Sequence, residues 1–213
     1  MDFLPHDIEN YALQHTTSES ELLYRLNRET HQKILKPRML SGHMQGRVLS
    51  MISKMIQPEK ILEIGTYTGY SALCLAEGLK EKGELITIDI NEEGKDFAQG
   101  FFDQSEHKNQ IHYHIGNALK IIPTLEGPFD IVFIDADKEN YLEYFHLVFD
   151  KVKQGGYIIA DNVLWSGKVV QEVKANDSDT KKLMEFNDFV QNNPQVENVL
   201  LPVRDGLMIA RKK

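Results

Sequence analysis

The sequence predicts an α/β protein built on a mostly parallel sheet. Short apolar runs that suit buried strands alternate with helical patterns along most of the chain, which is the pattern of crossover units. The last two apolar runs, near residues 196–201 and 207–211, are joined by Arg204-Asp205-Gly206. Because an Asp-Gly turn is typical of antiparallel hairpins, we expect such a hairpin at the edge of the sheet.

The N-terminal part of the chain is predicted to be helical. Residues 6–34 form two helices that separate near Ser18, and Ser18 with Glu21 makes a predicted capping box. A third helix covers residues 43–56. We expect a single domain in which residues 1–56 form a helical cap and residues 57–213 form the core.

Strands and helices alternate through the remainder of the chain. Gly83 closes the first helix of this part, as glycine commonly does. In chain order, the predicted elements are a strand at 60–64, a helix at 70–82, a strand at 84–88, a helix at 92–105, strands at 111–115 and 131–134, a helix at 139–152, a strand at 157–160 and a helix at 179–192.

The composition fits an acidic, globular protein. The chain has 213 residues, a formal net charge of −8 and one cysteine, Cys74, which we expect to be a small core residue. No stretch approaches the roughly 20 apolar residues of a membrane span, and the start of the chain lacks a signal-peptide pattern. We expect a cytoplasmic protein that does not contact a membrane.

Two apolar strands end at carboxylates. The run 131–134 is followed by Asp135, and the run 157–160 is followed by Asp161 and Asn162. Ligands of open α/β sheets bind beyond the carboxyl ends of the strands, so these side chains converge if the two strands are neighbours. Two carboxylates and an amide oxygen are hard oxygen ligands that suit Mg²⁺.

Each of these groups also has a plainer interpretation. Asp135, Asp137 and Lys138 could be a capped helix start with a local ion pair, and Asp161 with Asn162 could be a turn at a strand end. Their joint occurrence after two apolar strands favours the metal site.

A glycine-rich turn, Glu63–Ser71, lies where a strand becomes a helix. Glycines let the backbone approach a ligand closely there. The spacing does not match the dinucleotide fingerprint G-x-G-x-x-G, which argues against a dehydrogenase. Asp89 ends the next strand, where a carboxylate can accept both hydroxyls of a ribose. The pattern therefore predicts a nucleoside pocket.

Three motifs together resemble the cation-dependent class I O-methyltransferases, the group of catechol and caffeoyl-coenzyme A O-methyltransferases. These motifs are Glu63–Ser71, Phe133–Lys138 and Ala160–Trp165, and the resemblance covers nearly the whole chain. It implies a seven-stranded Rossmann-like sheet with helices on both faces, S-adenosylmethionine as methyl donor, a divalent cation, most often Mg²⁺, and a homodimer.

The resemblance also implies roles for individual residues. Asp135, Asp161 and Asn162 match the metal ligands of the family, and Lys138 matches its general base. The positions that match cofactor contacts are Ser41, Glu63, Gly65, Tyr67, Ser71, Asp89, Ala118, Asp135 and Asp137. The expected substrate contacts are Lys138, Asp161, Asn162 and Trp165, the last as an aromatic wall or as plain loop packing.

The expected acceptor is a small aromatic diol of the catechol or caffeoyl type, because two adjacent hydroxyls can chelate a cation. A hydroxylated uridine in transfer RNA is the alternative, since bacterial relatives in the family include such enzymes. In that case the basic residues within 25–38 would contact phosphates, although a solvated helix face also explains them. A non-catalytic S-adenosylmethionine-binding protein of the same fold is a distant third possibility.

Overall fold

A computed structural model describes residues 5–213 of the chain, which form two compact units. The first unit extends to Ala118, and the second runs from Leu119 to Lys213. The expectation of a single domain with residues 1–56 as a cap stays a prediction. Among the described residues, no helix has the length and apolar character needed to span a bilayer.

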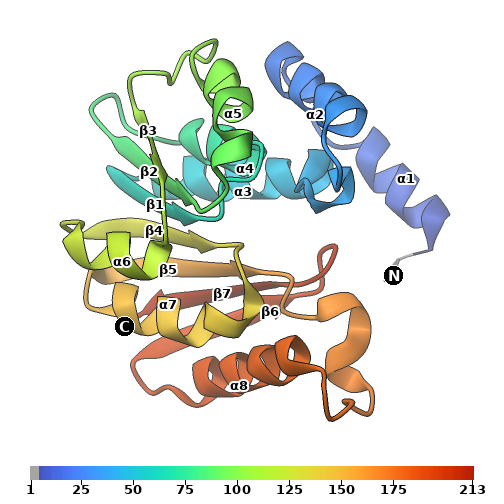
Figure 1. Cartoon of the computed structure of the whole chain (residues 1–213), viewed down its shortest axis with the longest axis vertical. Coiled ribbons are helices and arrows are strands. Elements are labelled where there is room, and N and C mark those ends of the chain that lie inside the picture. The colour runs from blue at the N-terminus through green and yellow to red at the C-terminus, as the bar shows by residue number, and fades with distance from the viewer. Residues whose placement is uncertain (1–4) are drawn as a thin grey trace. The chain divides into compact units, whose positions relative to one another are not determined.

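The first unit consists of helices and three parallel strands. In chain order its elements are α1 (His6–Gln14), α2 (Glu21–Lys33), η1 (Pro37–Met39), α3 (Gly42–Ile56), β1 (Lys60–Ile64), α4 (Tyr70–Ala76), β2 (Glu84–Asp89), η2 (Glu92–Gly94), α5 (Lys95–Phe102) and β3 (Ile111–Ile115). Strand β1 pairs with β2, and β2 pairs with β3, which gives the order β3-β2-β1 (Figure 1). All three strands run in the same direction, so their carboxyl ends lie at one edge.

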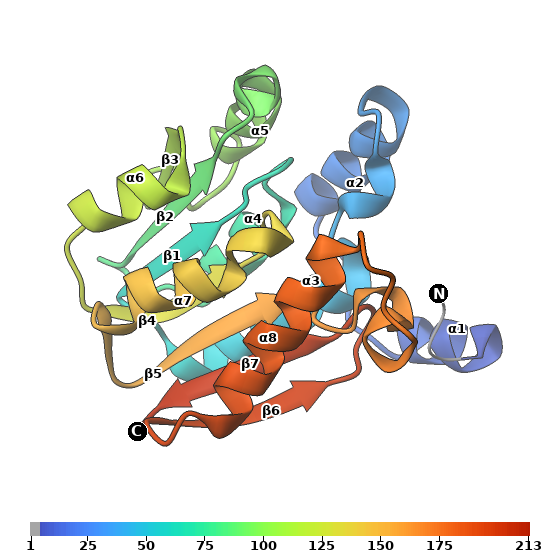
Figure 2. The same ribbon diagram turned by 60° about the horizontal axis from the view of Figure 1, so that its bottom comes forward.

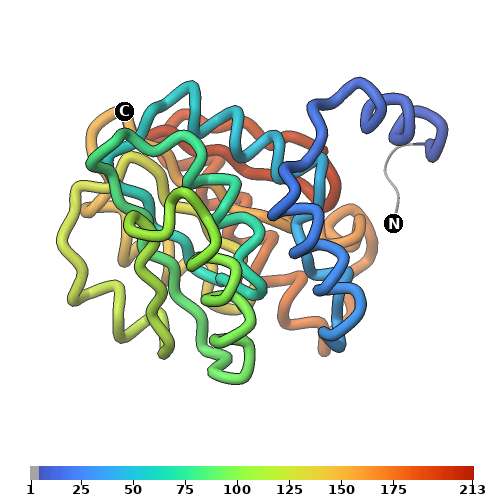
Figure 3. Tube along the Cα trace, turned by 90° about the horizontal axis from the view of Figure 1, so that it is seen from above, coloured from blue at the N-terminus to red at the C-terminus, as the bar shows by residue number. Residues whose placement is uncertain are grey.

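Helices α3 and α4 are joined by a cluster of polar contacts around Glu77. Arg47 donates two hydrogen bonds to this carboxylate, at 2.6 and 3.0 Å, and Ser50 and Lys54 each donate one at 2.8 Å. Cys74 of α4 is fully buried, as predicted. Helix α1, in contrast, extends from the end of this unit and buries none of its residues (Figure 3).

Two local predictions for the first unit are wrong. The helix expected at 70–82 ends at Ala76, because the chain then turns with short-range hydrogen bonds from Gly78 to Leu75 and from Leu79 to Ala76. The N-cap of α2 is Ser20 instead of Ser18, and its hydroxyl accepts the N–H of Leu23.

The second unit combines four strands with helices on one face of them. Its elements, counted from the helix at the boundary, are α6 (Ala118–Ile121), η3 (Ile122–Thr124), β4 (Phe129–Ile134), η4 (Lys138–Asn140), α7 (Tyr141–Phe149), β5 (Val152–Asp161), η5 (Trp165–Val170), α8 (Ser178–Asn192), β6 (Val196–Leu201) and β7 (Leu207–Lys212). Helices α7 and α8 lie side by side (Figure 2). They pack together through Phe145 and Phe186, whose rings meet edge to face.

Strand pairing in the second unit confirms the predicted direction changes. Strand β4 pairs with β5 in parallel, whereas β7 is antiparallel to both β5 and β6, which gives the order β4-β5-β7-β6. The strands of the described chain are thus mostly parallel, with an antiparallel hairpin at the C-terminus. This arrangement confirms the predicted fold class.

Candidate active site

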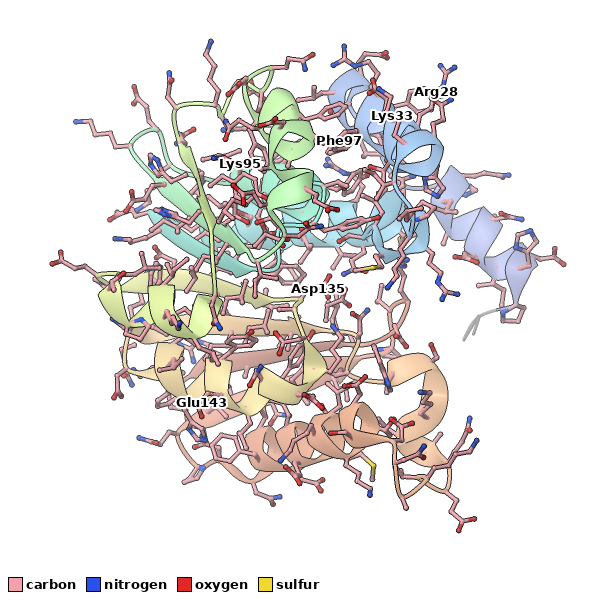
Figure 4. The ribbon with its side chains drawn as sticks, in the orientation of Figure 1. Arg28, Lys33, Lys95, Phe97, Asp135 and Glu143 are labelled. Carbon is pink, nitrogen blue, oxygen red and sulfur yellow. The ribbon has the colours of Figure 1, made fainter. Side chains whose placement is uncertain are left out.

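The ends of β4 and β5 bring two carboxylates next to each other. Ile134 of β4 pairs with Ala160 of β5, so Asp135, which follows β4, and Asp161, the last residue of β5, lie at the same level. Figure 4 labels Asp135 just beyond the end of its strand. Asp161 is only 3% exposed. The predicted neighbourhood of these strands is therefore confirmed by their register.

Lys138 begins the short turn η4 and points back to the end of β4. Its Nζ lies 3.1 Å from Asp135 Oδ1 and 2.5 Å from the hydroxyl of Tyr141. The residue is only 8% exposed. The ion pair of the plainer interpretation thus exists, but Asp137, the residue before the turn, makes no side-chain cap. Asp137 instead accepts a hydrogen bond from Tyr144, 2.5 Å away.

Asn162 follows Asp161 in a left-handed backbone conformation with a φ of 59°. Asparagine tolerates this region better than most residues. Its backbone N–H donates to Asp161 Oδ1 at 2.7 Å, which ties the two predicted ligands together.

Trp165 lies close to two lysines. The ring centre is 5.7 Å from Lys138 Nζ and 5.7 Å from Lys168 Nζ. The indole N–H is buried and has no hydrogen-bond partner among the described residues. The loop that carries this ring is held by Asp205, whose carboxylate accepts the N–H of Ser166 at 2.5 Å.

The donor set fits a hard divalent cation. In residues 5–213, no three His, Cys, Asp or Glu side chains gather closely enough to hold a metal ion. The predicted metal ligands include only two side chains of these types, Asp135 and Asp161, because the third ligand, Asn162, is an amide. Carboxylate and amide oxygens at adjacent strand ends are the ligand types that Mg²⁺ takes in proteins.

In the first unit, the turn after β1 has the backbone of a ligand-binding loop. Gly65, Tyr67 and Gly69 all have positive φ angles, of 102°, 51° and 88°. Any Cβ at Gly69 would overlap the ring of Phe102 within 2.6 Å, so this position requires glycine. The glycines of the motif therefore set the shape of the turn.

Two acidic residues support this turn. Asp89, at the end of β2, accepts the N–H groups of Tyr67 at 2.6 Å and Asn91 at 2.8 Å. Glu63 is fully buried in β1 and accepts a hydrogen bond of 2.5 Å from Thr87. The other predicted donor-contacting residues of this unit, all nearly buried, are Ser41, Ser71 and Ala118.

The basic residues predicted between 25 and 38 lie on or after α2. Arg25 donates to Gln104 at 2.5 Å, and Lys33 forms an ion pair with Glu29 at 2.6 Å. Arg28 and Lys33 point outward from the helix (Figure 4). Two members of this cluster thus have local partners, as expected for a solvated helix face.

Tyr141 belongs to the site but was not predicted. Its hydroxyl accepts from Lys138 and donates to the backbone oxygen of Asp161 at 3.0 Å. A sequence signal exists, since Tyr141 follows Lys138 by three residues and such pairs share a helix face. A tyrosine at the start of an apolar helix predicts core packing just as well, so the signal is weak.

The antiparallel hairpin after parallel strands and the glycine turn after β1 fit the class I methyltransferase fold. A family model described as O-methyltransferase matches residues 13–213, so the chain belongs to the O-methyltransferase family. Caffeoyl-CoA O-methyltransferase of Medicago sativa is 35% identical over 182 residues, which cover 79% of this chain and 72% of that protein.

Solved structures support the same assignment. The O-methyltransferase of Bacillus cereus, determined in complex with SAH, has a TM-score of 0.89 at 27% identity and covers 97% of each chain. TomG of Streptomyces achromogenes, determined in complex with SAM, gives the same TM-score and identity over 97% of this chain and 96% of its own. The predicted family, fold and enzyme class are confirmed.

Proposed function

We propose that this enzyme transfers a methyl group from S-adenosylmethionine to one hydroxyl of an ortho-dihydroxy aromatic compound, with Mg²⁺ as the divalent cation. The observation that supports this most strongly is the group at the ends of β4 and β5. Two carboxylates lie at one level at the ends of neighbouring strands, and a nearly buried lysine contacts one of them at 3.1 Å. This is the chemistry that an aryl hydroxyl requires in order to react as its anion.

In this proposal Asp135, Asp161 and Asn162 hold the cation. A bound divalent cation acts as a Lewis acid and favours the ionised form of an aryl hydroxyl, whose pKa in solution is near ~10. The near-complete burial of Asp161 limits competing water at its oxygens. Asn162 contributes a neutral oxygen, so the site retains net negative charge before the cation binds.

Lys138 is the general base in this proposal. In its uncharged amine form, Nζ accepts the proton that leaves the acceptor hydroxyl and becomes an ammonium group. The hydroxyl of Tyr141 and the carboxylate of Asp135 hold that nitrogen in place. Positioned general bases typically contribute about 100- to 10,000-fold in rate. Trp165 supplies a flat surface beside Lys138 against which an aromatic acceptor can stack.

The methyl donor is assigned to the turn after β1 and its supports. Asp89 accepts the ribose hydroxyls, and the backbone at Ala118 contacts the adenine. The remaining residues assigned to donor binding are Ser41, Glu63, Gly65, Tyr67, Ser71, Asp135 and Asp137. The SAM and SAH complexes of the two structural neighbours support a donor of this kind.

The acceptor is proposed from the relatives and the charge of the chain. Curated relatives named caffeoyl-CoA O-methyltransferase favour a caffeoyl-type diol. The net charge of −8 also disfavours a nucleic-acid acceptor. Hydroxylated uridine in transfer RNA is the second candidate, and the outward-pointing Arg28 and Lys33 on α2 favour it (Figure 4).

Incubation with labelled S-adenosylmethionine and Mg²⁺ tests the proposal against a panel of acceptors. The panel contains catechol, caffeoyl compounds, and transfer RNA with and without hydroxylated uridine. We expect label in a diol, and none in resorcinol, whose hydroxyls are too far apart to chelate one cation. Label in transfer RNA alone would replace the proposed acceptor, and equal labelling of resorcinol would contradict chelation.

We further propose that the enzyme is a cytoplasmic homodimer. Family resemblance supports the dimer, and α1, which buries none of its residues, exposes Ile8 and Tyr11 by 54% and 64%. Light scattering on the purified chain measures the mass directly. A monomer mass at micromolar concentration would contradict the dimer.

A further inference from the structure

We propose that Tyr141 is a positioning residue whose hydroxyl fixes Lys138 and the Asp161–Asn162 peptide relative to each other. This inference rests on the proposed role of Lys138 as general base. No motif of the sequence assigned Tyr141 a part in the site. Its contacts, all within the second unit, connect the start of α7 to the end of β5.

The hydroxyl of Tyr141 uses both of its hydrogen-bonding capacities. It accepts from Lys138 Nζ at 2.5 Å and donates to the backbone oxygen of Asp161 at 3.0 Å. A tyrosine hydroxyl has one proton, so donation to Asp161 leaves its oxygen free to accept from the lysine. One atom therefore sets the distance between the proposed base and the strand end that carries two proposed ligands.

The Asp161–Asn162 peptide is thereby held on both sides. Its oxygen accepts from Tyr141, and its N–H donates to Asp161 Oδ1 at 2.7 Å. The next residue after this peptide oxygen, Asn162, has a left-handed backbone conformation with a φ of 59°. Because this conformation is sparsely populated by side-chain-bearing residues, the two hydrogen bonds select the orientation in which the Asn162 amide leaves the strand.

The ring of Tyr141 is rigidly placed, as a positioning residue requires. It is fully buried and meets the ring of Phe186 in α8 edge to face, with centres 5.6 Å apart. The hydroxyl thus has little freedom to follow a moving lysine. Loss of the hydroxyl alone, in Tyr141→Phe, leaves this packing intact and lets Lys138 adopt other rotamers.

The test compares Tyr141→Phe with Tyr157→Phe, a control that removes a tyrosine hydroxyl four residues before Asp161 in β5. We expect Tyr141→Phe to lower kcat about 10-fold or more while the KM for S-adenosylmethionine stays within about twofold. Tyr157→Phe keeps the wild-type kcat. Unchanged kcat in Tyr141→Phe, or an equal loss in both variants, would overturn the proposal.

A second readout does not depend on activity. Trp165 is the single tryptophan, and its ring centre lies 5.7 Å from Lys138 Nζ, so its emission in the metal-free, ligand-free protein reports the position of that nitrogen. We expect Tyr141→Phe and Lys138→Met to change this emission and Tyr157→Phe to leave it unchanged. If the wild-type enzyme methylates no acceptor, the proposed function fails, and the positioning role of Tyr141 is then tested by the emission alone. An emission of Tyr141→Phe equal to that of wild type would overturn the positioning role.

Discussion

At the scale of residues, the site depends on which groups surround Lys138. The Nζ atom of Lys138 contacts the carboxylate of Asp135 and the hydroxyl of Tyr141. Burial of this residue to 8% exposure removes most of the water that would otherwise solvate it. A lysine in a surface ion pair would be far more exposed, which is why the geometry favours a chemical role over a helix-start ion pair.

We predict that Lys138→Ala lowers the methylation rate by about 100-fold or more, because the acceptor proton loses its receiving group. Binding of S-adenosylmethionine, measured by calorimetry, should change little. Lys168→Ala removes the other cation beside Trp165 and is the matched control. Lys168 donates to Asp177, which is not a proposed metal ligand. Equal losses of rate in the two variants would contradict the assignment of the base.

The sequence predicted that Asp135 and Asp161 lie close together because their positions follow from strand ends, whereas the role proposed for Lys138 came from the family resemblance. Asp135 and Asp161 come directly after apolar runs, and parallel neighbours bring such ends together. Tyr141 and Asp205 were missed as site residues for a physical reason. Their roles depend on which backbone atoms they reach, the Asp161 oxygen and the Ser166 N–H, and this is set by packing between segments distant in the chain.

At the scale of elements, Glu77 joins α3 to α4. Burial by itself would raise the pKa of this carboxyl, but hydrogen bonds from Arg47, Lys54 and Ser50 outweigh it and lower the pKa to about 2. Between pH 4.5 and about 2, Glu77 therefore binds a proton more readily in the unfolded chain than in the folded one. The stability contributed by Glu77 is therefore present above the ordinary pKa of 4.5 and is lost as the pH falls toward 2.

We predict that Glu77→Gln lowers the free energy of unfolding by about 1–3 kcal/mol at pH 7. The difference in free energy of unfolding between variant and wild type should be smaller at pH 3, because the stability contributed by the wild-type carboxylate decreases there. Urea unfolding at both pH values measures this, with Glu81→Gln, an exposed site, as control. A difference that is the same at pH 3 and pH 7 would contradict the ion-pair account.

Gly78 gives a second prediction about the packing of α3 and α4. A methyl group at this position would overlap the backbone of Ser53 and Lys54, whereas nothing lies within 4 Å of one at Gly100 in α5. We expect Gly78→Ala to destabilise the protein by about 1–3 kcal/mol and Gly100→Ala to stabilise it by about 0.5–1 kcal/mol. Thermal unfolding of both variants measures this, and a stabilised Gly78→Ala would refute the close approach.

The strands were predicted better than the helix ends. Strands β1 and β3 have the predicted bounds, since a buried strand is marked by its own apolar run. Strand β5 begins at Val152, five residues earlier than expected, because Gly155 adopts a φ of 77° and lets a polar segment continue the strand. Helix ends depend on which side chain caps the helix, and two nearby serines before α2 could not be distinguished by sequence.

At the scale of the whole molecule, the two units carry different parts of the proposed chemistry. The first contains the glycine turn and Asp89, and the second contains Asp135, Lys138, Asp161 and Asn162. In the proposed function, each unit supplies a component that the other lacks. The family match extends over residues 13–213, so both units belong to the enzyme that the relatives represent.

The most direct test of the account is the dependence of methyl transfer on a divalent cation. Labelled S-adenosylmethionine and a catechol acceptor are incubated with wild-type enzyme after chelation, and again after Mg²⁺ is restored. We predict that chelation abolishes transfer and Mg²⁺ restores it, whereas Asp161→Ala stays inactive with Mg²⁺ although it remains folded by circular dichroism. Comparable transfer by the chelated enzyme would contradict the central claim.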